Sequence, residues 1–130
     1  MERAIQRGFT MIELIVVIVI LGILAATALP KFIDMRSDAQ QAAVDGVAGA
    51  AAAAMSINYG GCSAAKDVPT AAKCVTISDC NLVGSIMQGG LPTGYTVASV
   101  ALATNGTTAT CTVTGLNSKT SAFVGIGAGN

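Results

Sequence analysis

The sequence predicts an α+β protein in which a long N-terminal helix packs, through its second half, against a small antiparallel β-sheet. Three observations lead to this prediction. An apolar run with a single charge occupies residues 9–29, an alanine-rich helical pattern follows it, and the last third of the chain alternates polar with apolar residues. With 130 residues, the chain can hold one long helix and one small head domain.

Composition and charge exclude several classes of function. The chain is 52% hydrophobic and 11% charged, which is too apolar for an ordinary soluble domain. Its formal net charge is zero, and no basic patch or aromatic platform points to a nucleic-acid partner. The chain contains no His, the usual general base and zinc ligand, so we expect neither catalysis nor a bound cofactor or metal.

The first expected element is a helix that begins in the apolar run, residues 9–29. As a helix this run would measure about 30 Å, the thickness of a bilayer core. Arg3 and Arg7 precede it, which places the N-terminus in the cytoplasm and the rest of the chain outside. Glu13 is the only charge in the run. Because an ionised side chain in hydrocarbon is costly, Glu13 indicates a functional site with a nearby partner.

Three interpretations of this run compete. The first is a secretory signal peptide that is cut near Ala26-Thr27-Ala28. The second is a plain membrane anchor, in which Glu13 reaches the cytoplasmic face. The third is a segment that is cut after Gly8 and later packs against copies of itself. Only the third gives Glu13 a partner, because the cut turns Phe9 into a new N-terminus whose α-amino group can neutralise the carboxylate.

The N-terminus resembles that of type IV prepilins over the stretch GFTMIELIVVIVILGILAATALPKF. In that family a short basic leader ends in Gly, Phe usually follows, Glu is fifth after the cut, and Pro stands about twenty-two residues in. Gly8, Phe9, Glu13 and Pro30 occupy these places. The resemblance implies cleavage between Gly8 and Phe9, N-methylation of Phe9, and a role for Glu13 in recruiting subunits. Residues 17–44 are most similar to the mannose-sensitive haemagglutinin subgroup of type IVa pilins.

The resemblance also implies a function. A type IV pilin is a structural subunit, held in the inner membrane as a prepilin with its N-terminus in the cytoplasm and then assembled into an extracellular filament for adhesion or motility. Its partners would be copies of itself, the prepilin peptidase, the inner-membrane assembly machinery and minor pilins. A pseudopilin or minor pilin of a type II secretion or related system shares the signature and is an alternative. A membrane-anchored periplasmic binding module is another.

Residues 31–60 predict an amphipathic continuation of the helix. From Ala39 onward its apolar stripe is expected to pack on the chain's own sheet, and Gly60-Gly61 is expected to end the helix. Gly22 and Pro30 weaken the helix, so we expect a kink between them in the monomer and partial unwinding in a filament. The apolar stripe consists of Phe32, Met35, Ala39, Ala43, Val47, Ala50, Ala54 and Ile57.

The head should contain a short helix and three strands. Asp79 is a plausible N-cap for a helix over Cys80–Gln88, and Asn105-Gly106 is a hairpin signal. The last residues, Gly125–Asn130, read as a loose tail. The expected strands are Tyr95–Ala103, Thr108–Thr114 and Thr120–Ile126. The expected divisions of the chain are a cleaved leader, residues 1–8; a membrane-spanning and filament-core helix, 9–30; an amphipathic helix, 31–60; and a disulfide-bonded head, 61–130.

Four cysteines, Cys62, Cys74, Cys80 and Cys111, all follow the apolar run. An even number in a small exported head favours two disulfides, for which three connectivities exist. The pairing Cys62–Cys74 with Cys80–Cys111 is preferred, because the first closes a local loop and the second joins the short helix to the hairpin. Each crosslink would contribute about 2–4 kcal/mol to the stability of a small core.

Overall fold

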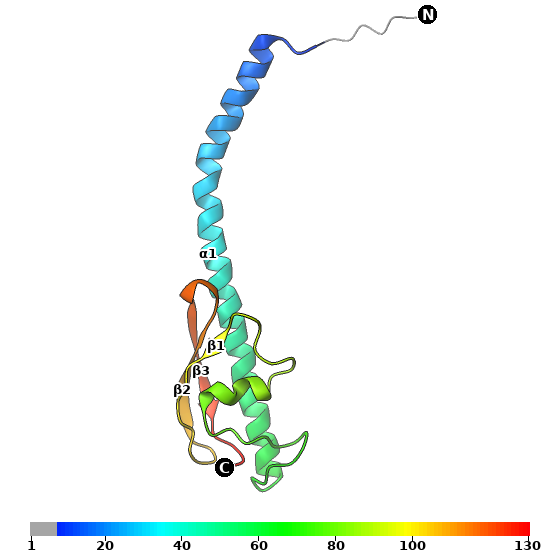
Figure 1. Ribbon diagram of the computed structural model, residues 1–130, viewed down its shortest axis with the longest axis vertical. Coiled ribbons are helices and arrows are strands. Elements are labelled where there is room, and N and C mark those ends of the chain that lie inside the picture. Colours follow the sequence, from blue (N-terminus) through cyan, green and yellow to red (C-terminus); the bar gives the residue numbers. More distant parts are fainter. Residues whose placement is uncertain (1–7) are drawn as a thin grey trace, which may run out of the picture. The chain divides into compact units, whose positions relative to one another are not determined.

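The computed structural model describes residues 8–130, so residues 1–7 of the expected leader lie outside the described residues. The chain divides into two compact units, Met1–Ser37 and Asp38–Asn130. One helix, α1 (Met11–Ala64), contributes to both units (Figure 1). The remaining elements belong to the second unit: the 3₁₀ helix η1 (Cys80–Ser85), β1 (Thr96–Val97), β2 (Thr108–Thr114), the 3₁₀ helix η2 (Leu116–Ser118) and β3 (Thr120–Ile126).

In the first unit α1 is a continuous helix that runs through both Gly22 and Pro30. Pro30 has no N–H to offer Ala26, so one hydrogen bond of the ladder is missing there. One turn earlier, the Thr27 hydroxyl donates to the carbonyl oxygens of Leu24 (3.0 Å) and Ile23 (3.3 Å), a contact typical of Thr inside apolar helices. The expected kink and the unwinding in a filament stay predictions.

The helix does not end at Gly60-Gly61, as the sequence suggested, but continues to Ala64. Its end is a Schellman cap, in which the Asp67 N–H bonds to the Cys62 carbonyl (2.7 Å) and the Lys66 N–H to the Ser63 carbonyl (3.2 Å). Lys66, not a glycine, takes the left-handed conformation (φ 56°). Gly61 serves another purpose, because a Cβ at this position would overlap the backbone carbonyl of Lys73.

The stripe of α1 that packs in the head is also not the expected one. The predicted stripe lies one residue, about 100° of rotation, away from the buried one, and its member Ile57 is 76% exposed. Alanines occur on several faces of this part of the helix, so the spacing of apolar residues does not by itself determine which face is buried. The larger side chains Val44 and Met55 do, because they fill the core. The buried residues are Val44, Ala48, Ala51, Met55, Asn58 and Cys62.

The sheet is antiparallel with strand order β1-β2-β3 and lies beside the second half of α1 (Figure 1). Strands β2 and β3 have the predicted bounds, and their register runs from Thr108 opposite Ile126 to Thr114 opposite Thr120. Alternation buries Cys111 and Val113 and leaves Thr110 exposed. The core between helix and sheet contains Val44, Ala48, Ala51, Met55, Ile77, Cys80, Val83, Leu102, Cys111, Val113 and Phe123.

The first strand is much shorter than the expected Tyr95–Ala103. Only Thr96 and Val97 pair with β2 as a strand, opposite Thr114 and Val113. The chain then leaves the sheet to pair with the segment before η1, where the Leu102 N–H bonds to the Ser78 carbonyl (2.8 Å). This detour buries Leu102 completely. Leu102 is thus a core residue rather than part of a regular hairpin.

The short helix begins where expected but ends early. The Asp79 carboxylate accepts the Asn81 N–H (2.9 Å) as an N-cap, and η1 stops at Ser85 instead of Gln88. The expected loose tail is wrong. The Asn130 side-chain amide donates to the carbonyls of Leu102 (2.8 Å) and Ile77 (3.1 Å), and Ala128 is fully buried. These bonds hold the end of the chain against the core.

Two disulfides join the parts of the head, Cys62–Cys74 and Cys80–Cys111, and these are the preferred pairings. Cys62–Cys74 ties the end of α1 to the loop that follows it. Cys80–Cys111 joins η1 to β2 within the main core. Gly125 on β3 leaves room for the second bridge, because a Cβ there would overlap the Cys111 sulfur.

Candidate functional site

The start of α1 forms a compact polar site around Glu13. The helix begins at Met11, so Thr10 is its N-cap and Glu13 is the third residue of its first turn. The Thr10 N–H and hydroxyl both donate to Oε2 of Glu13, at 2.8 and 2.9 Å. In return, the Glu13 N–H donates to Oγ1 of Thr10 at 3.3 Å. This reciprocal pattern is a capping box, which satisfies backbone donors at the helix start.

The capping box explains how a carboxylate is held at this position before any partner binds. The N-terminal end of a helix carries partial positive charge, which favours a negative side chain in the first turn. Hydrogen bonds from Thr10 add to this effect and fix the orientation of the Glu13 carboxylate. Sequence analysis named Glu13 but missed Thr10. The signal was present, because Thr10-Met11-Ile12-Glu13 is the capping-box pattern directly before an apolar run.

The expected cleavage site lies immediately before this box. Gly8 and Phe9 belong to no regular element, and both are exposed. Phe9 retains 88% of its accessible surface, and no atom outside the local backbone lies within 4 Å of a Cβ built on Gly8. On its Phe9 side, a protease that acts on this bond would therefore meet exposed chain that is not yet helical.

The helical surface after Glu13 is apolar and uncovered within the subunit. Large side chains point outward around the whole helix, so that Leu14 is 56% exposed and Leu24 57%. Within residues 8–130, α1 is the one helix long and apolar enough to cross a membrane. Side chains that are apolar on every face need lipid or other helices around them.

The head offers structural rather than reactive groups. Its cysteines are paired, and the described residues hold no group of three or more His, Cys, Asp or Glu placed to bind a metal ion. The hydrogen bond from the Ser99 hydroxyl, at 2.6 Å, lowers the pKa of Asp79 below its usual value, with help from the Asn81 N–H. This carboxylate thus joins the start of η1 to the chain that leaves β1.

Comparisons with known proteins point to the same end of the chain. Residues 3–29 match the family described as prokaryotic N-terminal methylation motif. The type IV narrow pilus major component PilA5 of Thermus thermophilus is 40% identical over 105 residues, which cover 81% of this chain and 78% of that protein. No solved structure shows a significant match.

Two further relatives match over shorter stretches. Fimbrial protein EcpC of Eikenella corrodens is 44% identical over 59 residues, which cover 45% of this chain and 39% of that protein. The type IV major pilin protein PilE1 of Neisseria gonorrhoeae is 55% identical over 38 residues, or 29% of this chain and 23% of that protein. Of these three proteins, only the Thermus protein is similar over most of both chains. Its similarity therefore extends well beyond the methylation motif.

Proposed function

Because this chain belongs to the type IV pilins, and is therefore a structural subunit of a pilus, we propose that it enters the filament through α1 and that Glu13 recruits each new subunit. The observation that carries this proposal is the capping box. It presents one oriented carboxylate at the start of a helix whose following apolar surface is exposed on all sides. The role we propose for the chain is assembly rather than catalysis.

The chemistry of the partner follows from processing. Cleavage between Gly8 and Phe9 by a prepilin peptidase would create a positive α-amino group close in sequence to Glu13. On a neighbouring chain, that amine meets a carboxylate already held by Thr10. A charge pair that is also hydrogen-bonded is favourable in a low-dielectric setting, whereas either charge alone is costly there. N-methylation of Phe9 would keep the positive charge.

The same segment would serve two stages of the subunit's life. Before assembly, residues 9–30 hold the prepilin in the inner membrane, with the assembly machinery nearby. In the filament, neighbouring helices replace lipid around the same side chains, and minor pilins can join by the same contact. Adhesion or motility would be properties of the finished filament on the cell surface.

Substitution of Glu13 tests the proposal. Glu13→Val should give processed subunit that stays in the membrane and forms no surface filaments. Glu13→Gln keeps an oxygen that can accept from Thr10 but lacks the charge, so it should fail as well. The matched control is Ile12→Val, an apolar change at the adjacent exposed position, which should assemble normally. Wild-type amounts of sheared filament from Glu13→Val would show that recruitment does not depend on this carboxylate.

A further inference from the structure

The turn before β2 contains a chemically labile pair, Asn105-Gly106. Gly106 has a positive φ of 77°, and the Thr107 N–H donates to the Thr104 carbonyl (3.1 Å), which closes the turn. Asn is one of the thermolabile residues of proteins. In an Asn-Gly pair no side chain shields the glycine nitrogen, so this nitrogen can attack the neighbouring side-chain amide. The function proposed above makes no use of this pair.

Both reacting groups of the pair are held by residues 127–130. The Asn105 side chain donates through Nδ2 to the backbone oxygen of Asn130 (3.1 Å) and accepts the Asn130 N–H through Oδ1 (2.9 Å). The Gly106 N–H donates to the Gly127 carbonyl (2.8 Å). The amide that would be attacked and the nitrogen that would attack it are therefore both bonded elsewhere. The half-buried Asn105 side chain has to break two hydrogen bonds before it can turn toward Gly106.

Residues 127–130 are themselves fixed to the head. Ala128, which is fully buried, exchanges two backbone hydrogen bonds with Ile77 (2.8 and 3.2 Å). The Thr76 hydroxyl donates to the Gly129 carbonyl (2.9 Å). The side chain of Asn130 adds its two bonds to backbone carbonyls, one of which is that of Ile77. Side-chain and backbone donors together thus hold the segment in place.

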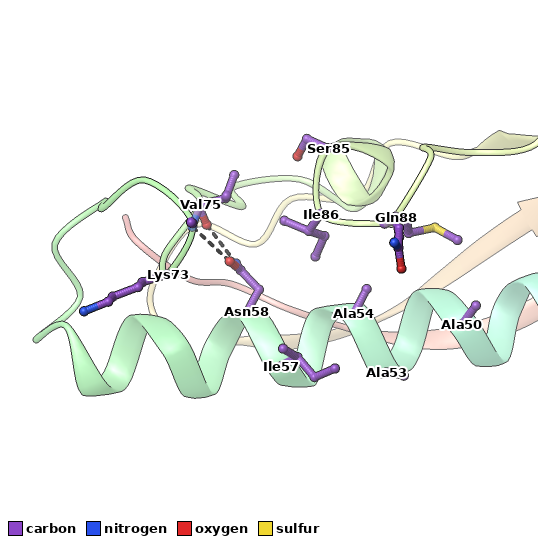
Figure 2. A pocket seen from close by; sticks show the side chains of 12 residues that line it. Ala50, Ala53, Ala54, Ile57, Asn58, Lys73, Val75, Ser85, Ile86 and Gln88 are labelled. Atoms are coloured by element: carbon purple, nitrogen blue, oxygen red, sulfur yellow. Dashed lines mark hydrogen bonds between the residues drawn. The ribbon is translucent and has the colours of Figure 1, made fainter.

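The chain at residues 75–77 is a firm base for this contact. The Asn58 side chain donates to the Val75 carbonyl (2.8 Å) and accepts the Val75 N–H (2.9 Å), as Figure 2 shows. The Cys62–Cys74 disulfide joins the residue before Val75 to the end of α1. Asn58 and Val75 also line a hollow of about 600 Å³ on the head (Figure 2). Because the helix and the disulfide hold this base, the turn can open when residues 127–130 alone detach.

The reaction that becomes possible on detachment is deamidation. The Gly106 nitrogen forms a bond to Cγ of Asn105, the bond from Cγ to Nδ2 breaks, and Nδ2 leaves as ammonia with the proton that Gly106 gives up. Water then opens the resulting succinimide ring and leaves aspartate or isoaspartate at position 105. The reaction consumes a water molecule and releases an ammonia molecule, and it involves no oxidant or reductant.

We propose that Asn105 is a deamidation site that residues 127–130 keep closed, and that its modification loosens this segment. A carboxylate at position 105 still accepts the Asn130 N–H, but it has no donor for the backbone oxygen of Asn130, and its negative charge lies beside that oxygen. The aspartate therefore favours the detached segment, which uncovers Ala128 and the Cys62–Cys74 bridge that it packs against. A transient local opening is in this way converted into a lasting one.

Mass spectrometry of peptides from the detergent-solubilised chain, kept folded at mildly alkaline pH, tests whether the segment closes the site. Asn105 should convert far more slowly in the folded wild type than in the reduced, urea-unfolded chain. Asn130→Ala removes two hydrogen bonds, so detachment should become easier and the rate at Asn105 should rise at least about tenfold. Thr76→Val removes one bond and should raise the rate several-fold. The matched control is Thr110→Val on the exposed face of β2, which should leave the rate unchanged.

Two results would overturn the proposal. One is a folded wild type that deamidates at Asn105 as fast as the unfolded chain. The other is an unchanged rate at Asn105 in both Asn130→Ala and Thr76→Val. Asn117-Ser118, exposed between β2 and β3, serves as an internal reference. If its rate rises together with that of Asn105 in Asn130→Ala, that variant has opened more than the segment, and Thr76→Val, which keeps the size of the side chain, decides.

Asn105→Asp tests the effect of the modification, because it installs the product directly. Amide hydrogen exchange at residues 127–130 should be several-fold faster in this variant than in the wild type. The matched control is Asn117→Asp, which adds the same charge at an exposed position and should leave the exchange of that segment unchanged. Exchange at the wild-type rate in Asn105→Asp would overturn the claim that modification loosens the segment.

Discussion

Removal of the Cys80–Cys111 disulfide should destabilise the head more than removal of Cys62–Cys74. The two bridges span 31 and 12 residues. Loop-closure entropy then assigns about 3.7 kcal/mol to the longer bridge and about 2.8 kcal/mol to the shorter one at 25 °C. The longer bridge also lies in the main core, where Cys80 and Cys111 are both fully buried, so alanines there would leave a cavity as well.

Tyrosine fluorescence provides an assay that reports on the head alone. The chain has no Trp and only two tyrosines, Tyr59 and Tyr95, which both lie in the second unit. Tyr59 packs near the Cys62–Cys74 bridge and Tyr95 against the main core. Urea titrations of the detergent-solubilised chain would compare the wild type with the two double alanine variants. A midpoint that falls further for Cys62→Ala/Cys74→Ala than for Cys80→Ala/Cys111→Ala would refute the reasoning.

Three other changes test separate parts of the account. Gly61→Ala should hinder the Cys62–Cys74 bridge, because its Cβ would overlap the Lys73 carbonyl, and free thiols in the purified subunit would report this; complete oxidation would contradict it. The pKa of Asp79 is lowered in the folded chain, so its contribution to stability is present above the ordinary Asp pKa and is lost as the pH falls below it. Asp79→Asn should therefore make the free energy of unfolding depend less on pH in the acid range. An unchanged dependence on pH would contradict this prediction. Pro30→Ala restores a backbone donor within α1, so its filaments should resist extension under force more than wild-type filaments, and equal extensibility would exclude a role for this position.

The sequence predicted best the features that local chemistry determines. The bounds of β2 and β3 follow from strict alternation of Thr with apolar residues, and Asp79 was recognisable as an N-cap because few residues suit that position. The pairing of the cysteines followed from which segments each bridge could join. For the two strands and the N-cap, a short stretch of sequence contained the whole physical cause.

Features that depend on distant contacts were predicted less well. In an alanine-rich helix, several faces satisfy the same periodicity, and only Val44 and Met55 against the sheet select the buried one. Gly61 looked like a helix terminator, but the approach of Lys73 explains it. The segment after β1 left the sheet because Leu102 completes the core, and Asn130 is held by carbonyls of residues 77 and 102. None of these partners is visible from neighbouring residues.

At the candidate site, the sequence identified the carboxylate but not its support. Glu13 was predictable because it is the one charge in an apolar run. Thr10 was not predicted, because an isolated charge in an apolar run indicates a partner on another chain, whereas the capping box supplies hydrogen bonds from within the same helix start. A hollow on the head could not be predicted, since it arises where Ala72, Lys73, Val75 and residues 85–88 meet α1 in space.

The intact mass of subunits from sheared surface filaments tests the central claim most directly. The account predicts a chain that begins at Phe9, carries one methyl group on that residue, and lacks four hydrogens relative to its reduced form because both disulfides are present. A subunit that begins at Leu29 would instead mark residues 1–28 as an ordinary signal peptide. That result would contradict assembly through α1, because the segment that holds Glu13 would be absent from the filament.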